Sequence, residues 1–306
     1  MRIFFAKLMT MFLFPRNFRH RVRDKIMAAP YKKAYNQIKS QWLAHNDGKL
    51  LLPGRFSEYD LVIGIGSTCL VTDMLKSFNL RRFTTPFDWT AGMEPINWLS
   101  QPGIYRDTRF REKIQAICDN FKDWTNPKYF KYVSTFNKDK HHNIVNVKTH
   151  IRYLHEFPAD QDILQYFPQF VTKTSRRIQN LYNALNNSKT VLIVWLSRTG
   201  DQCGLLEKNV SYQDIKWAVN KMQKQYPAKQ FDFVFFEHDG TKNRFEYEKI
   251  NVTENAFKIK SNHFLNDFGY NFINILPDWR PHIHVISEML DNIKLSKQAF
   301  ALKPES

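Results

Sequence analysis

Residues 61–75, LVIGIGSTCLVTDML, decide the fold. The first part of this segment is an apolar run rich in β-branched residues and bounded by glycines, which predicts a buried strand over residues 59–65. The last part has the apolar spacing of a helix, expected from about residue 69 to 78. The turn between them therefore lies at the carboxyl end of a buried strand, which is the edge where open α/β folds bind their ligands.

Two other strongly apolar runs, KTVLIVWL at 189–196 and FDFVFFE at 231–237, predict further buried strands. Weaker strands are expected at 129–135, 144–149, 247–250 and 256–260, and helices at 94–101, 107–123, 160–186, 211–225 and 281–295. Strong apolar strands separated by amphipathic helices are typical of a parallel sheet that is covered on both faces. The sequence therefore predicts an α/β fold with a mainly parallel central sheet flanked by helices.

The amino-terminal segment has a composition of its own. Apolar residues dominate 3–14 and basic residues dominate 16–25, in a chain whose 45 Lys and Arg against 29 Asp and Glu give a net charge of +16. An apolar wedge beside a basic stripe is typical of a helix that lies on an anionic membrane surface. A helix packed on its own domain would give the same pattern. We therefore expect a basic amphipathic helical appendage at 1–54 and an α/β catalytic domain at 55–306.

The location of the protein is predicted from several missing signals. No run of about 18 apolar residues occurs, and the amino-terminal segment has no small-residue cleavage site, so we expect neither a membrane span nor a signal peptide. The three cysteines have no metal-type spacing, and the pair His282 and His284 has no carboxylate at a recognisable distance. The prediction is a cytoplasmic protein, peripheral at the inner face of the cell membrane, with no metal and no cofactor.

Cys69 follows the turn Gly66-Ser67-Thr68 and falls at or near the first turn of the predicted helix. The unpaired N–H groups and the dipole of a helix amino terminus favour an anion, so the pKa of this thiol should fall and its thiolate should become nucleophilic. The same N–H groups could hold a developing oxyanion. Two other interpretations stay open: Cys69 packs as a small apolar residue, or the turn GIGST cradles a nucleotide phosphate.

Several motifs occur in a defined order along the chain: GSTC at 66–69, LRRFTTPFDW at 80–89, HEFP at 155–158 and RRI at 176–178, followed by the strand TVLIVWL. This order resembles a bacterial domain family of unknown function that is labelled papain-like cysteine peptidase. Members of that family tend to be encoded with surface-polysaccharide genes. The resemblance spans roughly residues 59–237. It departs from the family pattern at Glu156, where the family usually has Asp, and from Trp195 to Arg198.

The resemblance implies that Cys69 is a nucleophile and that His155 is its base. A thiol that attacks a carbonyl needs an imidazole to take and return its proton, and the imidazole needs a polar partner to fix its tautomer. Asp88 in PFDW is the first candidate for that partner and Glu156 the second, while His150 is a rival to His155. The residues expected to bind the substrate or the oxyanion are Gly66, Ser67, Thr68, Trp89 and Arg177.

Each of these residues also has a structural interpretation. Asp88 could cap a turn while its aromatic neighbours plug the core, and His155 could be an ordinary strand-end histidine. Arg177 could belong to a solvated basic face of a helix. The adjacent His141 and His142 are expected in a charged loop, KDKHH, in contact with water.

The function that the sequence favours is a Cys–His acyl-transfer enzyme, a hydrolase or an acyltransferase, that acts on a surface glycan or its lipid-linked precursor. The alternative is a glycosyltransferase in which GIGST and basic residues grip a nucleotide-sugar and Asp88 or Glu237 is the base. A membrane-associated scaffold is a third hypothesis. Nucleic-acid binding is not expected, because the basic residues are spread out and no recognised motif accompanies them. The substrate and the oligomeric state are left open.

Overall fold

The computed structural model describes several stretches of the chain: residues 58–66, 70–92, 109–136, 140–197, 209–239, 241–242, 246–261, 289–290 and 292–297, together with Ser40 and Ala44. The predicted appendage at 1–54 lies outside these stretches except for those two residues. Ser67, Thr68 and Cys69 also lie outside them, as do the predicted helix at 94–101 and residues 281–288 and 291 of the one at 281–295. The predicted end of the latter helix is wrong, because Lys294–Leu295 is a strand. No helix within the described stretches is long and apolar enough to cross a lipid bilayer.

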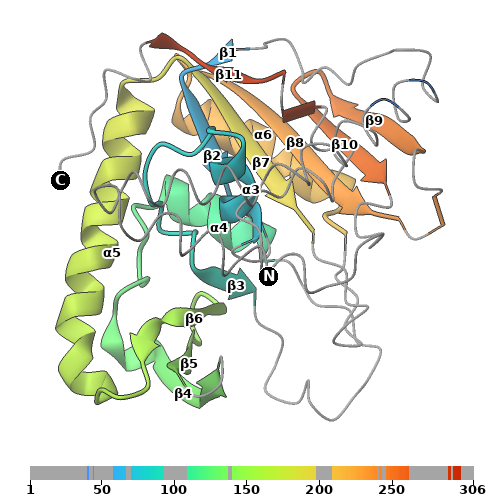
Figure 1. Ribbon diagram of the computed structural model, residues 1–306. Helices are drawn as coiled ribbons and strands as arrows, with labels where there is room; N and C mark the ends of the chain where they lie inside the picture. Colours follow the sequence, from blue (N-terminus) through green and yellow to red (C-terminus); the bar gives the residue numbers. More distant parts are fainter. Residues whose placement is uncertain are drawn as a thin grey trace, which may run out of the picture.

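A five-stranded sheet forms one layer of the fold, in the order β2-β7-β8-β10-β9 (Figure 1). Its strands are β2 (Leu61–Gly64), β7 (Thr190–Leu196), β8 (Gln230–His238), β10 (Ala256–Ser261) and β9 (Tyr247–Thr253). The first four run parallel to one another, and β9 runs antiparallel to β10. The strands predicted from the three apolar runs and from the segments near 247 and 256 are confirmed.

Both faces of this sheet are buried, because alternate side chains of its strands enter two separate cores. One core gathers Ile63, Ile193 and Phe233 with side chains of α4 (Phe110–Cys118), α5 (Ile163–Asn186) and α6 (Tyr212–Gln225). The other gathers Val62, Leu192 and Val234 with side chains of α3 (Leu70–Ser77) and with Met289 and Leu290. The continuous apolar runs in the sequence follow from this double coverage.

A second, antiparallel sheet has the order β3-β6-β5-β4. Its strands are β3 (Thr90–Gly92), β4 (Phe130–Phe136), β5 (His141–Asn146) and β6 (Ile151–Pro158). The prediction of a mainly parallel central sheet is therefore wrong, although the α/β class is confirmed. The segment 130–158 holds three strands separated by short turns, and such turns can join only antiparallel neighbours. A third, two-stranded sheet pairs β1 (Glu58–Tyr59) with β11 (Lys294–Leu295) in parallel.

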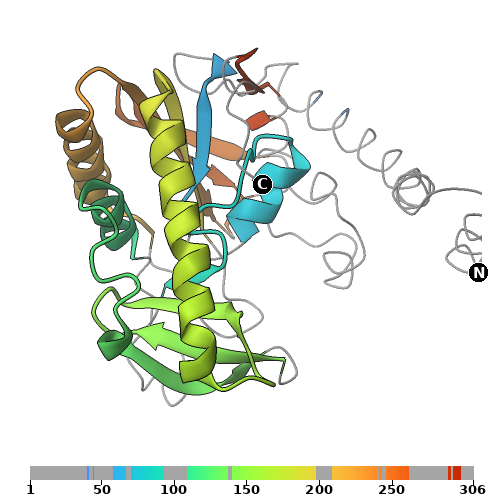
Figure 2. The ribbon, with the colours of Figure 1, turned by 90° about the vertical axis from the view of Figure 1, so that its left-hand side faces the viewer.

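Helix α5 packs against both of the larger sheets. Its amino-terminal half places Phe170 against Phe157 of β6, with ring centroids 4.8 Å apart. Its carboxyl-terminal half places Leu181 and Leu185 in the same core cluster as Ile193 of β7. Figure 2 shows the helix running along one side of the molecule past both layers. The aromatic and aliphatic residues of α5 therefore join the antiparallel sheet to the five-stranded sheet.

Candidate active site

The turn that follows β2 is held at Gly66. The carbonyl oxygen of Gly66 accepts a hydrogen bond of 2.5 Å from Nζ of Lys113, a fully buried side chain of α4. The same ammonium group lies 5.9 Å from the centroid of the Trp195 ring, a distance at which a cation is attracted to an indole face. A buried cation thus anchors the backbone three residues before Cys69.

Helix α3 begins at Leu70, directly after Cys69 in the sequence. The strand predicted before this segment and the helix predicted after it are therefore confirmed. Close packing explains the glycine: a Cβ atom on Gly66 would lie 2.9 Å from Cβ of Val71 and 3.1 Å from the carbonyl oxygen of Leu196. Neither neighbour can move without displacing α3 or β7.

A Gly66→Ala variant is therefore expected to be less stable by about 1–3 kcal/mol, because the new methyl group overpacks the turn. We also expect it to slow alkylation of Cys69. Gly64→Ala is the matched control, since its Cβ would meet side-chain atoms of Val71 and Leu75 at 3.0–3.2 Å, and these can rotate. Urea unfolding and mass spectrometry of alkylated protein measure the two effects. Equal effects of the two substitutions would contradict the close approach at Gly66.

Asp88 of the PFDW motif is bound within its own loop. Its Oδ2 accepts hydrogen bonds from Arg81, 2.9 Å from Nε and 2.5 Å from Nη2, and from the backbone N–H of Thr85. Its Oδ1 accepts a hydrogen bond of 2.5 Å from the Thr85 hydroxyl. Phe87 packs in the core against Phe121 and is 2% exposed. The described contacts thus give Asp88 the turn-capping role and pair it with Arg81 and Thr85 instead of His155.

Trp89, the next residue, brings the PFDW motif to His155. The Trp89 and His155 rings meet edge to face with centroids 5.9 Å apart. These two residues are 66 positions apart in the sequence and come together because β3, which follows Trp89, pairs with β6. The structure therefore brings together two of the residues that the sequence predicted for one site.

An irregularity in β6 sets the direction of His155. Ile144 of β5 pairs with Tyr153 and His142 pairs with Phe157, so the three residues 154–156 of β6 stand opposite one residue of β5. Such bulges re-aim side chains and are frequent beside active sites. Here the bulge lets Tyr153 and Phe157 pack toward α5 while the His155 ring meets Trp89.

The surroundings of His155 favour its neutral form. Burial is the largest cause that lowers the pKa of His155, and the neighbouring His141 lowers it further, while Glu156 opposes both. The His141 and His155 rings lie 5.5 Å apart and nearly perpendicular. A neutral imidazole can accept a proton, so His155 is suited to act as a general base at neutral pH.

Glu156 and Arg177 form a buried ion pair between β6 and α5. The side chain of Glu156 is 5% exposed and that of Arg177 is 17% exposed. Both predicted site residues therefore have a structural partner in each other. Glu156 is directed toward α5, whereas the His155 ring contacts Trp89 and His141.

Two residues near His155 were missed by the sequence analysis. His141 was predicted in a hydrated loop, and this is wrong, because β5 begins at His141. Asn143, 4% exposed, is the residue of β5 opposite the bulge. The sequence analysis expected this strand to begin at Ile144, because polar residues precede it and the charged stretch KDK before them suggested a loop.

The second carboxylate considered as a glycosyltransferase base, Glu237, is also bound to a cation. It is fully buried at the end of β8, and Nζ of Lys258 lies 2.8 and 3.0 Å from its two oxygens. Burial raises the pKa of Glu237, and the charge of Lys258 opposes that rise. Asp88 and Glu237 are therefore both occupied in ion pairs.

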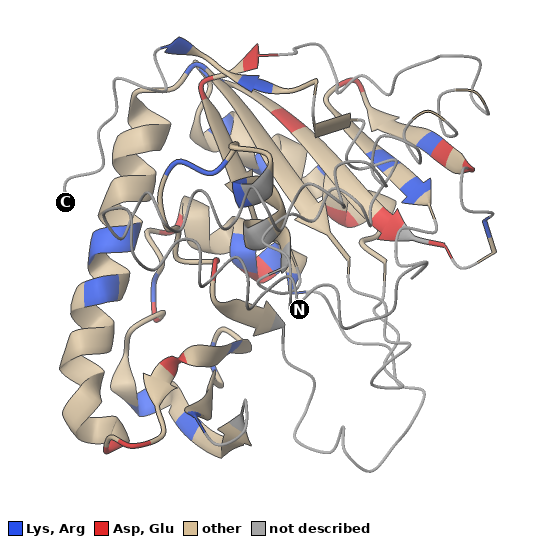
Figure 3. Cartoon of the chain, in the orientation of Figure 1, with Lys and Arg blue, Asp and Glu red and all other residues tan. Residues whose placement is uncertain are grey.

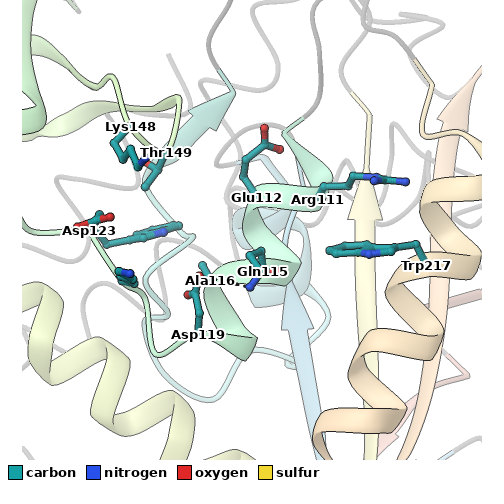
Figure 4. Close-up of a pocket in the computed structure, with 11 residues that line it drawn as sticks. Arg111, Glu112, Gln115, Ala116, Asp119, Asp123, Lys148, Thr149 and Trp217 are labelled. Carbon is teal, nitrogen blue, oxygen red and sulfur yellow. Dashed lines mark hydrogen bonds between the residues drawn. The ribbon is translucent and has the colours of Figure 1, made fainter.

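A cavity of 450 Å³ lies on the outer face of α4, between Trp217 of α6 and the turn that holds Lys148 and Thr149 (Figure 4). Acidic and basic side chains both line it, and no residue predicted for the active site does.

Cys118 at the end of α4 is a poor nucleophile, because burial raises the pKa of its thiol to about 11. Among the described residues, the chemistry predicted from the sequence therefore centres on His155.

Charges are spread over the described elements instead of gathering on one surface. Figure 3 shows basic segments on α4, α5, β9 and β10, with acidic segments interspersed among them. The basic residues of the described elements are therefore dispersed, as the sequence analysis described them when it expected no nucleic-acid binding.

A family described as "Putative papain-like cysteine peptidase (DUF1796)" matches residues 60–241. The matched residues make up more than half of the chain and include its segments GSTC, PFDW and HEFP. The chain belongs to this family. The papain-like peptidase family match starts at β2 and continues past β8, so β9, β10 and β11 lie beyond it. No curated protein and no solved structure matches the chain.

Proposed function

We propose that this protein is a thiol-dependent acyl-transfer enzyme, a hydrolase or an acyltransferase, with Cys69 as nucleophile and His155 as base. The observation that carries the proposal is the contact between Trp89 and His155, which joins two separate motifs within the family match. Membership of a family described as a papain-like cysteine peptidase supports Cys-based hydrolysis. The lowered pKa of His155 supports its role as a base.

The reaction follows from these roles. His155 takes the proton of the Cys69 thiol while sulfur attacks the substrate carbonyl and forms a C–S bond. The resulting oxyanion is held by N–H groups at the start of α3. The intermediate collapses to a thioester, and His155 returns the proton to the leaving group. Water or an acceptor hydroxyl then attacks the thioester with His155 again as base, which releases the acyl product and restores the thiol.

The pH dependence follows from the pKa of His155. Burial lowers this pKa, so the neutral base form persists to pH values below the ordinary histidine pKa. On acidification through that lowered pKa the imidazole becomes protonated and the base is lost. The folded state loses stability as the pH falls from the ordinary histidine pKa to that lowered pKa, because over this range the unfolded chain binds the proton more readily.

The test is alkylation of the native protein with iodoacetamide from pH 5 to 9, with Cys69, Cys118 and Cys203 resolved by mass spectrometry. We expect Cys69 to react with an apparent pKa well below the free-thiol value of about 8.5, and His155→Ala to raise that apparent pKa toward it. Cys118, with its raised pKa, is the internal control. An inert Cys69, or one unaffected by His155→Ala, would rule out the Cys–His pair.

The substrate that we propose is an acylated surface glycan or its lipid-linked precursor at the inner face of the membrane. The resemblance to a family encoded with surface-polysaccharide genes supports this choice, and so does the apolar and basic composition of 1–54. Binding of the full chain to vesicles that contain anionic phospholipid, compared with vesicles of neutral phosphatidylcholine, tests the membrane part. Equal binding to both vesicles would contradict it.

A further inference from the structure

The face of the antiparallel sheet that points away from α5 carries polar side chains of β5. His142 and Ile144 are on the α5 side: His142 Nε2 is 3.1 Å from the carbonyl oxygen of Gln161, just before α5, and Ile144 lies in the core with residues of that helix. Side chains alternate along a strand, so His141 and Asn143 are on the opposite side. The His155 ring is on that side as well, since it contacts His141.

The His141 ring has one nitrogen without a hydrogen-bond partner. Nδ1 of His141 is buried and has no hydrogen-bond partner in the structure. A buried acceptor without a donor is costly. The His155 ring meets the His141 ring edge to face at 5.5 Å between centroids, and an imidazole N–H is a donor that such a nitrogen can accept from.

We propose that His141 is the positioning residue of His155, and that its Nδ1 accepts a ring N–H of His155. This hydrogen bond fixes the His155 tautomer and leaves the opposite ring nitrogen to act as the base toward Cys69. The role of this pair in catalysis rests on the proposed function, whereas the hydrogen bond between the two rings does not. His141 then takes the place that the sequence analysis gave to Asp88.

The pair also sets the charge of His155. The titratable and charged groups that act on this ring are His141 from β5 and Glu156 from β6, and Arg177 from α5 is paired with Glu156. Burial is the largest cause that lowers the pKa of His155, and the neighbouring His141 lowers that pKa further. His141 therefore adds to the effect of burial in keeping His155 in the neutral form that a base requires.

Asn143 is the rival acceptor on the same face. Its Nδ2 donates to the Ser134 hydroxyl at 3.1 Å, and its Oδ1 is buried without a hydrogen-bond partner in the structure. His141 is favoured because its ring directly contacts His155. The two candidates make different predictions for single substitutions.

The experiment is a pH titration of the full chain labelled with ¹⁵N-histidine, in which the imidazole ¹⁵N shifts report the tautomer and the pKa of His155. A Cys69→Ser background removes coupling to the thiol. We expect one dominant His155 tautomer at neutral pH. In His141→Ala we expect mixed tautomers and an upward shift of the His155 pKa toward its ordinary value. His142→Ala, on the other face of β5, is the matched control and should leave both readouts unchanged.

Further variants separate the hydrogen bond of His141 from its effect on the His155 pKa. His141→Asn supplies an acceptor oxygen that does not titrate, so it should restore the single tautomer without restoring the part of the pKa lowering that comes from His141. With Cys69 intact, His141→Ala should slow alkylation at neutral pH by about tenfold to a hundredfold through misplacement of the base. An unchanged His155 in folded His141→Ala, or the tautomer change in Asn143→Ala instead, would overturn the assignment. An inert Cys69 with a normal His141 effect would refute the proposed function alone.

Discussion

A Cys69→Ala variant is expected to lose the thiol-dependent hydrolysis of an activated ester such as p-nitrophenyl acetate by at least about a thousandfold, because removal of the nucleophile removes the covalent route. The substitution deletes one sulfur atom, and the turn before it is anchored through Gly66 and Lys113. We therefore expect the variant to stay folded. Release of p-nitrophenol measures the rate, and circular dichroism checks the fold.

Cys118→Ala is the control for that experiment. Its thiol is partly buried beside Met222, and its pKa is raised to about 11, so its loss should leave the hydrolysis rate unchanged. A Cys69→Ala protein that hydrolyses the ester as fast as the parent would exclude Cys69 as the nucleophile. A rate that instead follows Cys118 would locate the reactive thiol at the end of α4.

The second large effect is expected from Glu237→Ala, which should lower the free energy of unfolding by about 3–5 kcal/mol. Lys258 is buried, and its ammonium group is held by both oxygens of Glu237 and by the carbonyl oxygen of Val210. Removing the carboxylate leaves the charge of Lys258 buried with only part of its hydrogen bonding. Urea unfolding measures the effect as a shift of the midpoint at constant slope.

The double variant Glu237→Met with Lys258→Met is the matched control. It removes both charges and replaces them with apolar side chains, so it should recover most of the stability lost in Glu237→Ala. A double variant as unstable as Glu237→Ala would show that the loss arises from packing and not from an unpaired charge.

The parallel part of the fold was predictable from the sequence because its strands are buried on both faces. Runs such as TVLIVWL have no polar interruptions, and helix α5 has a clear amphipathic pattern with Asp162 as its amino-terminal cap. The antiparallel sheet was only partly predictable. Its strands have one core face and one polar face, and a bulge interrupts β6, so the period of two is lost over HEFP.

The same contrast holds for the site. His155 and Trp89 were found from motifs, and the pairing of β3 with β6 brings them together. Asp88 was assigned by its residue type alone, whereas its real partners depend on how the loop 81–88 closes on Arg81. His141 could not be found, because its importance depends on the register between β5 and β6, which no local sequence pattern encodes.

Helix α5 determines how cooperatively the two larger sheets unfold. Its 24 residues span about 36 Å, and its two halves pack into one core that residues of both larger sheets share. Neither sheet can lose this helix without exposing the other, so the two layers should melt as one cooperative unit. A destabilising substitution at Leu185, at the end of the helix far from the β6 contacts, would then also unfold the site around His155 and so reduce activity.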